Sequence, residues 1–219
     1  MSSLTLKVIA LTTMIIDHYG AIFQTSELIF RIIGRIAFPI YCFLIVEGYF
    51  HTKDIKKYAA KLLIFALISE IPFDYAFFGR IDWSHQNIFF TLFIGLVSIH
   101  LLEKYKTQNS FNSLIIVLAA TTLAIVLKTD YSFIGIIYIL AFYKTKNFNR
   151  SKRILLVGAV MFITNYSSTS FIQQYSLLAL PILLLYNGKL GLKVKALQIL
   201  FYIAYPLHLA IFAFINLHQ

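Results

Sequence analysis

The chain has few charged residues and no long polar stretch. Only 13% of its 219 residues are Asp, Glu, Lys or Arg, while 59% are apolar. Soluble domains usually contain about 25% charged residues. The mean hydropathy is +0.78, and every polar connector is too short to fold by itself. We therefore expect one integral membrane domain over residues 1–219.

Cysteine is also scarce, because Cys42 is the single example in the sequence. One cysteine excludes a disulfide within the chain and a cluster of thiolate metal ligands. Cys42 lies in an apolar segment rich in aromatic and aliphatic residues, so we interpret it as a packing residue. We expect no bound metal ion.

Acidic residues are outnumbered by basic ones, 9 against 19, which gives a net charge of +10. A basic balance of this size can indicate a nucleic-acid binder. Here the lysines and arginines gather in short connectors between apolar runs, where they carry topology information instead. We therefore expect membrane lipids around the chain and no nucleic-acid partner.

The apolar runs have the length of membrane-spanning helices, which need about 20 residues. We expect an all-α, polytopic transmembrane bundle of about nine spans. The sixth and seventh spans are short, so a broken, partly inserted pair and a total of eight spans stay open. The expected spans cover residues 6–24, 28–50, 55–78, 87–103, 112–128, 131–143, 153–166, 171–186 and 196–217.

The basic residues also predict an orientation. With the N-terminus in the cytoplasm, most lysines and arginines lie on the inner side, as the positive-inside rule requires. The exceptions are Arg31, Arg35, Arg80 and Lys128. We expect a multi-pass protein of the cytoplasmic (inner) cell membrane with its N-terminus inside and its C-terminus outside.

Several expected spans contain polar side chains that are costly in lipid. A charge at the bilayer centre costs ~2.5–3.5 kcal/mol on insertion scales, so such residues usually face a protein interior or a wet cavity and serve a function. Counted along the spans, these residues fall at one depth in the outer half of the membrane. The coincidence predicts a single polar site. Its expected members are Asp17, His18, Arg31, Arg35, Glu70, Asp74, Asn87, Thr91 and His208.

Three prolines lie inside the spans that carry these residues. Pro39, Pro72 and Pro206 each remove a backbone donor and are expected to kink their helices. The freed carbonyl groups need partners or water, which suits a cavity.

A second polar group is expected at the inner surface. Glu47 and His51 are four residues apart, and Lys57 and Lys61 share one helix face. This group could bind an anionic cytosolic ligand such as a nucleotide phosphate. The alternative is that the lysines flank a span, extend to the interface and set the topology.

Blocks of sequence over nearly the whole chain resemble the TraX family. They are ordered along the chain as in that family, and they include all the polar residues of the first group and Glu47 and His51 of the second. The blocks are LKVIA at 6–10, MIIDHYG at 14–20, RIIGRIAFP at 31–39, EGY at 47–49 with HT at 51–52, SEIPFD at 69–74, NIFFT at 87–91 and FYIAYPLHL at 201–209.

The resemblance implies a membrane-embedded acyltransferase. The named example of the family acetylates the N-terminal amine of a conjugative pilin subunit at the inner membrane. The family is also similar to polytopic acyltransferases, in which a membrane-embedded histidine passes an acyl group from a cytosolic CoA thioester to an acceptor across the membrane. We therefore expect acetyl-CoA, or another acyl-CoA, as co-substrate. The acceptor would be an amine or hydroxyl on a pilin-like or other small exported protein, or on a glycan.

Within this scheme, His18 is interpreted as the catalytic base or the transient acyl carrier. Imidazole suits proton transfer at neutral pH, because its reference pKa is about 6.5. The bland alternative is a hydrogen bond between helices. His208, with Tyr205 on the same face, is a second acid/base candidate or a structural donor. Asp17 is expected to pair with Arg35 or to orient the site from its own helix.

Arg35 has two possible roles. It either neutralises the Glu70 and Asp74 carboxylates, or it stabilises an oxyanion or holds a phosphate. One of the two carboxylates could also bind the ammonium group of an acceptor. Asn87 and Thr91 are candidates for hydrogen bonds to a substrate carbonyl. The remaining histidines, His51, His85, His100 and His218, are interpreted as surface or interface residues.

Two other functions stay open on the residues alone. Buried Asp, Glu, His and Arg are also what a proton-linked transporter needs, although the halves of the chain share no motifs, unlike transporters with inverted repeats. The polar residues could instead be contacts between helices in a structural membrane subunit of a conjugation or secretion system.

Overall fold

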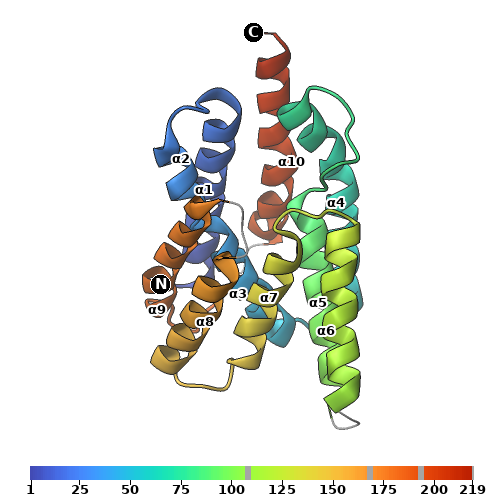
Figure 1. Cartoon of the computed structure of the whole chain (residues 1–219), viewed down its shortest axis with the longest axis vertical. Helices are drawn as coiled ribbons and strands as arrows, with labels where there is room; N and C mark the ends of the chain where they lie inside the picture. Colours follow the sequence, from blue (N-terminus) through green and yellow to red (C-terminus); the bar gives the residue numbers. More distant parts are fainter. Residues whose placement is uncertain (107–109, 167–169, 192–194, 219) are drawn as a thin grey trace.

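The computed structural model describes residues 1–106, 110–166, 170–191 and 195–218. Over these ranges the chain folds as a helical bundle, and its extended pairing is limited to an isolated bridge between Gln86 and Thr129. Figure 1 shows the helices side by side, with α10 projecting furthest at the C-terminal end. The elements are α1 (Ser3–Phe23), α2 (Leu28–Gly34), α3 (Ala37–His51), α4 (Ile55–Phe78), α5 (Ile88–Lys104), α6 (Ser110–Val126), α7 (Ser132–Lys144), α8 (Arg150–Asn165), the 3-10 helix η1 (Phe171–Leu178), α9 (Ala179–Leu184) and α10 (Lys195–Leu217).

The expected all-helical membrane bundle is confirmed. Among the described residues, three stretches are long and apolar enough to cross a membrane: Ser3–Phe23, Leu28–His51 and Leu197–Leu217. Shorter apolar helices occupy Ser110–Val126, Ser132–Lys144 and Phe171–Leu184. Many large apolar side chains also point outward, including a row on α4 at residues 64, 67, 68 and 71. An exterior of this kind suits lipid rather than water.

The second expected span is two helices and not one. α2 ends at Gly34 and α3 begins at Ala37, with Arg35 and Ile36 between them in right-handed helical conformations. Pro39 lies in the first turn of α3, where a missing backbone N–H costs nothing. It therefore helps to start α3, in contrast to the expected kink within a span. Pro72 and Pro206 do lie inside their helices, α4 and α10.

The centre of the bundle is formed by α3, α5 and α7, which have the most continuous buried surfaces. Helices in membranes associate through close van der Waals packing, so small residues mark their crossings. At the α5–α7 crossing, a Cβ placed on Gly95 would lie 2.3 Å from the Ile139 Cδ1 atom. α10 packs along α4 and α1 at the edge of this centre.

Candidate active site

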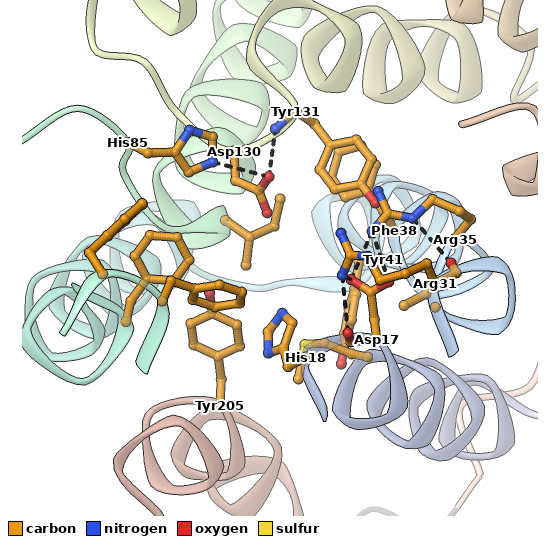
Figure 2. A pocket seen from close by; sticks show the side chains of 17 residues that line it. Asp17, His18, Arg31, Arg35, Phe38, Tyr41, His85, Asp130, Tyr131 and Tyr205 are labelled. Carbon is orange, nitrogen blue, oxygen red and sulfur yellow. Dashed lines mark hydrogen bonds and ion pairs between the residues drawn. The ribbon is translucent and has the colours of Figure 1, made fainter. Parts of the chain in front are cut away.

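A cavity of about 180 Å³ opens between α1, α2, α3, α4 and α10. Two connectors complete its wall, one between α4 and α5 and one between α6 and α7. Figure 2 shows the side chains that meet there. The polar and aromatic members of the lining are Asp17, His18, Arg31, Arg35, Phe38, Tyr41, Phe73, Phe77, Phe78, His85, Asp130, Tyr131 and Tyr205.

One side of the cavity is a carboxylate held by two arginines. Asp17 Oδ2 lies 2.7 Å from Arg31 Nη1 and 2.8 Å from Arg35 Nη2. Arg35 Nη2 also donates to Asp17 Oδ1 at 2.8 Å. Its other nitrogens are engaged too, Nη1 with Gln173 Oε1 at 3.3 Å and Nε with the Arg31 carbonyl at 3.4 Å. All three guanidinium nitrogens of Arg35 are thus engaged in contacts that hold the site together.

Arg31 is less completely engaged than Arg35. Its Nη1 atom donates to the Asp17 carbonyl at 3.0 Å as well as to the carboxylate. Among the described residues, its Nη2 and Nε atoms have no recorded partner. The side chain is 29% exposed, against 13% for Arg35. Arg31 therefore has donors left for a negatively charged group in the cavity.

The contact between α1 and α2 depends on Gly34. A Cβ at this position would lie 2.1 Å from both the Cβ and the Oδ1 atoms of Asp17. Side chains essentially never approach so closely, so only glycine lets α2 bring Arg31 and Arg35 to Asp17. Gly34 thus leaves room for the contact, and Arg35 supplies the charge that pairs with Asp17.

The floor of the cavity carries two histidines in contact. His18 Nδ1 lies 2.7 Å from His208 Nε2, and His208 Nδ1 lies 2.7 Å from the Ala204 carbonyl oxygen. Both imidazoles are buried. His18 lines the cavity, whereas His208 lies behind it. The Phe77 and Tyr205 rings pack against His18 with centroid distances of 5.3 Å and 5.9 Å.

The opposite side of the cavity is a second acid–base pair. His85 Nε2 lies 3.4 Å from Asp130 Oδ1, which also accepts the Tyr131 backbone N–H at 3.0 Å. Figure 2 shows this pair facing the Asp17–arginine group across the cavity. His85 lies outside the helices and is partly exposed. Its hydrogen bond with the Asp130 carboxylate raises the pKa of the His85 imidazole.

The Asp130 segment is held in an unusual backbone conformation. Lys128, Tyr131 and Ser132 have φ angles of 53°, 59° and 45°, although none is glycine. The backbone N–H of Asp130 donates to the Gln86 carbonyl at 2.8 Å. The Thr91 hydroxyl donates to the Asp130 carbonyl. Left-handed non-glycine residues cost free energy and gather at functional sites. The turn that places Asp130 and Tyr131 in the cavity wall therefore lowers the stability of the fold.

Comparisons with known proteins identify a family over nearly the whole chain. The sequence model of a family described as "TraX protein" matches residues 2–216. The chain belongs to the TraX family. It is 24% identical to the "Probable fimbrial assembly protein FimC, serogroup H1" of Dichelobacter nodosus, over 96% of this chain and 93% of that protein. It is 28% identical, over 49% of its length, to 40% of a protein of Rickettsia prowazekii (strain Madrid E) described as uncharacterized. No solved structure matches the chain.

In this TraX family member, four of the predicted substrate-binding residues do not line the cavity. Asp74 Oδ2 accepts the Asp82 backbone N–H at 3.1 Å. Glu70 accepts the side-chain amide of Asn87, and Asn87 caps α5 by accepting the Phe89 N–H at 3.1 Å. Thr91 holds the Asp130 turn, as described above. These residues support the cavity wall, and only Tyr205 of the predicted group lies in the lining.

Of the two roles predicted for Arg35, the pairing with Glu70 and Asp74 is wrong. The predicted pairing of Asp17 with Arg35 is confirmed. The expectation failed because a common depth in the membrane does not specify which helices are neighbours. α1 and α2 are consecutive antiparallel helices, and Gly34 brings them together.

The predicted inner group is dispersed. Glu47 pairs with Arg153 of α8 at 3.3 Å, and His51 Nδ1 lies 2.7 Å from the Glu47 carbonyl oxygen. Lys57 is highly exposed and lies 3.3 Å from Asp54, the N-cap of α4. The Lys61 ammonium lies 5.2 Å from the centre of the Tyr202 ring. These contacts leave Lys57 and Lys61 accessible at one end of α4 and bury the Glu47 carboxylate in a separate ion pair.

Sequence reasoning missed His85, Asp130 and Tyr131 as parts of the site. His85 was interpreted as a surface or interface residue, and it is partly exposed, but its ring also lines the cavity. A signal for Asp130 was available, because it is the only Asp or Glu in the sequence after Glu103. Within the described ranges, no group of three or more His, Cys, Asp or Glu residues could hold a metal ion.

Proposed function

We propose that this TraX family member is a membrane-embedded acyltransferase. It moves an acyl group, acetyl in the simplest case, from acyl-CoA to an amine or hydroxyl acceptor. The observation that carries the proposal is the placement of His18. Its imidazole lines a cavity, is supported from behind by His208, and lies beside an arginine with unused donors.

The reaction needs a base and a group that stabilises negative charge. The acceptor N–H or O–H gives its proton to His18 as the nitrogen or oxygen attacks the thioester carbonyl carbon. The C–N or C–O bond forms, and negative charge collects on the carbonyl oxygen. Arg31 stabilises this oxyanion through its unused guanidinium donors. The C–S bond then breaks, and the CoA thiolate takes the proton back from His18.

The remaining cavity residues position these two groups. Arg35 holds Asp17, and Asp17 in turn orients Arg31. The cavity of about 180 Å³ is well below the ~300–1,000 Å³ of sites that enclose drug-sized ligands. We therefore propose that only the acyl thioester end of the donor enters it. The donor phosphates would bind near Lys57 and Lys61, which are accessible cations.

We further propose the cytoplasmic (inner) membrane as the location, with a multi-pass topology and the N-terminus inside. The apolar helices and the distribution of basic residues support this orientation. The Dichelobacter nodosus relative is named as a probable fimbrial assembly protein. It supports an acceptor of the pilin-like, exported class, modified at the outer side of the membrane.

The first experiment follows labelled acetyl groups. Purified protein in lipid is incubated with radiolabelled acetyl-CoA and membrane extract, beside the His18→Ala variant. The proposal expects label to leave CoA with the wild type and not with a variant that folds as the wild type does. The labelled product identifies the acceptor. Absence of both transfer and acetyl-CoA binding would refute the proposal in favour of a transporter or a structural subunit, which proton-coupled uptake into vesicles would tell apart.

A further inference from the structure

The two buried histidines form a chain of hydrogen bonds with a fixed direction. The Ala204 carbonyl oxygen can only accept, so His208 Nδ1, 2.7 Å away, must carry a proton. A neutral imidazole has one N–H, and His208 Nε2 is therefore an acceptor. His18 Nδ1, which lies 2.7 Å from it, must then donate. The network assigns the tautomer of both rings.

Both rings are neutral in this arrangement for a physical reason. His18 and His208 are buried, and charge without a counter-ion is expensive in such surroundings. The nearest carboxylate on the same helix, Asp17, is already held by Arg31 and Arg35. No carboxylate contacts either imidazole within the described part of the chain, so an imidazolium would be uncompensated.

The consequence concerns the other nitrogen of His18. With its single proton on Nδ1, the ring presents an unprotonated Nε2, which has no recorded partner among the described residues. The Phe77 and Tyr205 rings pack edge-on against His18, and the His208 ring lies nearly parallel to it at a centroid distance of 5.0 Å. This packing hinders rotation of the ring, which would exchange the two nitrogens.

From these contacts we infer that His208 is a positioning residue that locks His18 in the Nδ1–H tautomer, with Nε2 as the basic atom facing the cavity. The Ala204 carbonyl fixes His208, and His208 fixes His18. His208 itself touches no substrate. The inference rests on the proposed function only for the reaction that Nε2 serves, because the tautomer itself is a property of the resting protein.

The tautomer can be measured without any assay of activity. The full chain is labelled with ¹⁵N-histidine, reconstituted in lipid bilayers and examined by ¹⁵N NMR, which separates protonated from unprotonated ring nitrogens. The His18→Ala spectrum identifies the His18 signals. We expect a protonated Nδ1 and an unprotonated Nε2. A protonated Nε2, a mixture of tautomers or a doubly protonated His208 would overturn the inference.

Two substitutions of His208 separate positioning from packing. In His208→Gln, the amide oxygen lies near the original Nε2 position and can still accept from His18. In His208→Leu, the volume is similar and the acceptor is gone. We expect the glutamine variant to keep the Nδ1–H tautomer and most of the transfer rate. The leucine variant should give mixed tautomers and a kcat lower by about tenfold with little change in KM. Equal effects of both substitutions would mean packing alone.

The two measurements also distinguish this inference from the proposed function. The predicted tautomer without acetyl transfer would leave the inference standing and refute the acyltransferase. Acetyl transfer together with the opposite tautomer would refute the inference and support the acyltransferase. The wild-type spectrum decides the inference even if His208→Leu fails to fold.

Discussion

Two arginine–carboxylate pairs in this bundle are buried to almost the same degree. Arg35 and Asp17 are 13% and 12% exposed, and Arg153 and Glu47 are 12% and 18% exposed. By burial and charge alone they are equivalent. They differ in what surrounds them, since the first pair lines the cavity described above and the second connects α3 and α8 outside that cavity.

The surroundings show what each pair does. Arg153 also donates to the Phe142 carbonyl at 3.2 Å, and its guanidinium lies 4.8 Å from the centre of the Phe43 ring. It connects α8 to α3 and α7. At the cavity, Asp17 holds a second cation, Arg31, whose Nη2 and Nε atoms have no partner among the described residues. A buried ion pair is thus weak evidence of function by itself, and a place in the lining of a cavity is the stronger evidence.

The largest expected effect comes from Asp17→Asn. The substitution leaves the buried Arg35 guanidinium and the partly exposed Arg31 guanidinium without a counter-ion, which costs about 3–5 kcal/mol. Thermal unfolding in detergent or lipid should therefore show a strongly destabilised protein. Label transfer from acetyl-CoA should fall at least as far as in His18→Ala. A variant with wild-type stability would mean that Asp17 is not the common counter-ion of Arg31 and Arg35.

The next prediction concerns the packed pair. Glu47→Leu or Arg153→Met alone leaves one uncompensated charge and should destabilise the bundle by about 3–5 kcal/mol. The double variant should recover most of that loss. The matched double variant Asp17→Leu with Arg35→Met should recover less, because Arg31 remains unpaired.

The same single and double variants also compare the two ion pairs in their effect on acetyl transfer. In the folded Glu47/Arg153 double variant, acetyl transfer should fall much less than in any Asp17 variant. Unfolding midpoints and initial rates of transfer measure the two effects on the same samples. Equal recovery of stability in both double variants would remove the distinction between the pairs.

Arg31→Gln should act on the reaction more than on the fold. Asp17 keeps Arg35 as its counter-ion, so the loss of stability should be modest. If Arg31 stabilises the oxyanion, kcat should fall by about 10²-fold, with KM little changed. Arg80→Gln is the matched control, because Arg80 is highly exposed and lies 3.7 Å from Asp82 outside the cavity. A fall in transfer that is no larger for Arg31→Gln than for Arg80→Gln would exclude this role.

The smallest expected effect is the pH dependence of the His85–Asp130 pair. Since the pKa of His85 is raised in the folded protein, its contribution to stability is fully present below the unfolded pKa of about 6.5. The contribution is lost as the pH rises through the folded pKa. Both side chains are partly exposed, so the difference should stay below about 1 kcal/mol.

Unfolding midpoints between pH 6 and pH 9 measure this effect. His85→Gln should remove the part of the pH dependence that the pair contributes, and Asp130→Asn should remove the same part. His218→Gln, near the C-terminus, serves as the control substitution. A pH dependence that is identical in His85→Gln and the wild type would show that the pair is not coupled to folding.

Much of the fold followed from the sequence because hydropathy specifies helices well. Each of the nine expected spans has a helical counterpart. The break at Arg35 was not foreseen, since the mean hydropathy of Leu28–His51 stays high in spite of Gly34 and Arg35. Pro39 was assigned to a helix interior rather than a first turn.

The same reasoning predicted only part of the site. Periodicity places Asp17, His18 and His208 at one depth, but not in contact, because depth along a helix does not specify its rotation or its neighbours. The place of Asp130 in the site was missed for another reason. Its side chain reaches the cavity through a turn with left-handed non-glycine residues, and tertiary contacts rather than local preference stabilise such a turn.

The close approach at Gly34 also bears on how this site can vary. A single added methyl group there would collide with Asp17, although it changes no charge, no hydrogen-bonding group and no hydropathy class. In a library of all single substitutions, position 34 should therefore be as intolerant as the charged residues themselves. A search for functional positions that considers only reactive side chains would overlook Gly34. The missing Cβ atom at this position limits which substitutions the site tolerates as strongly as the reacting groups do.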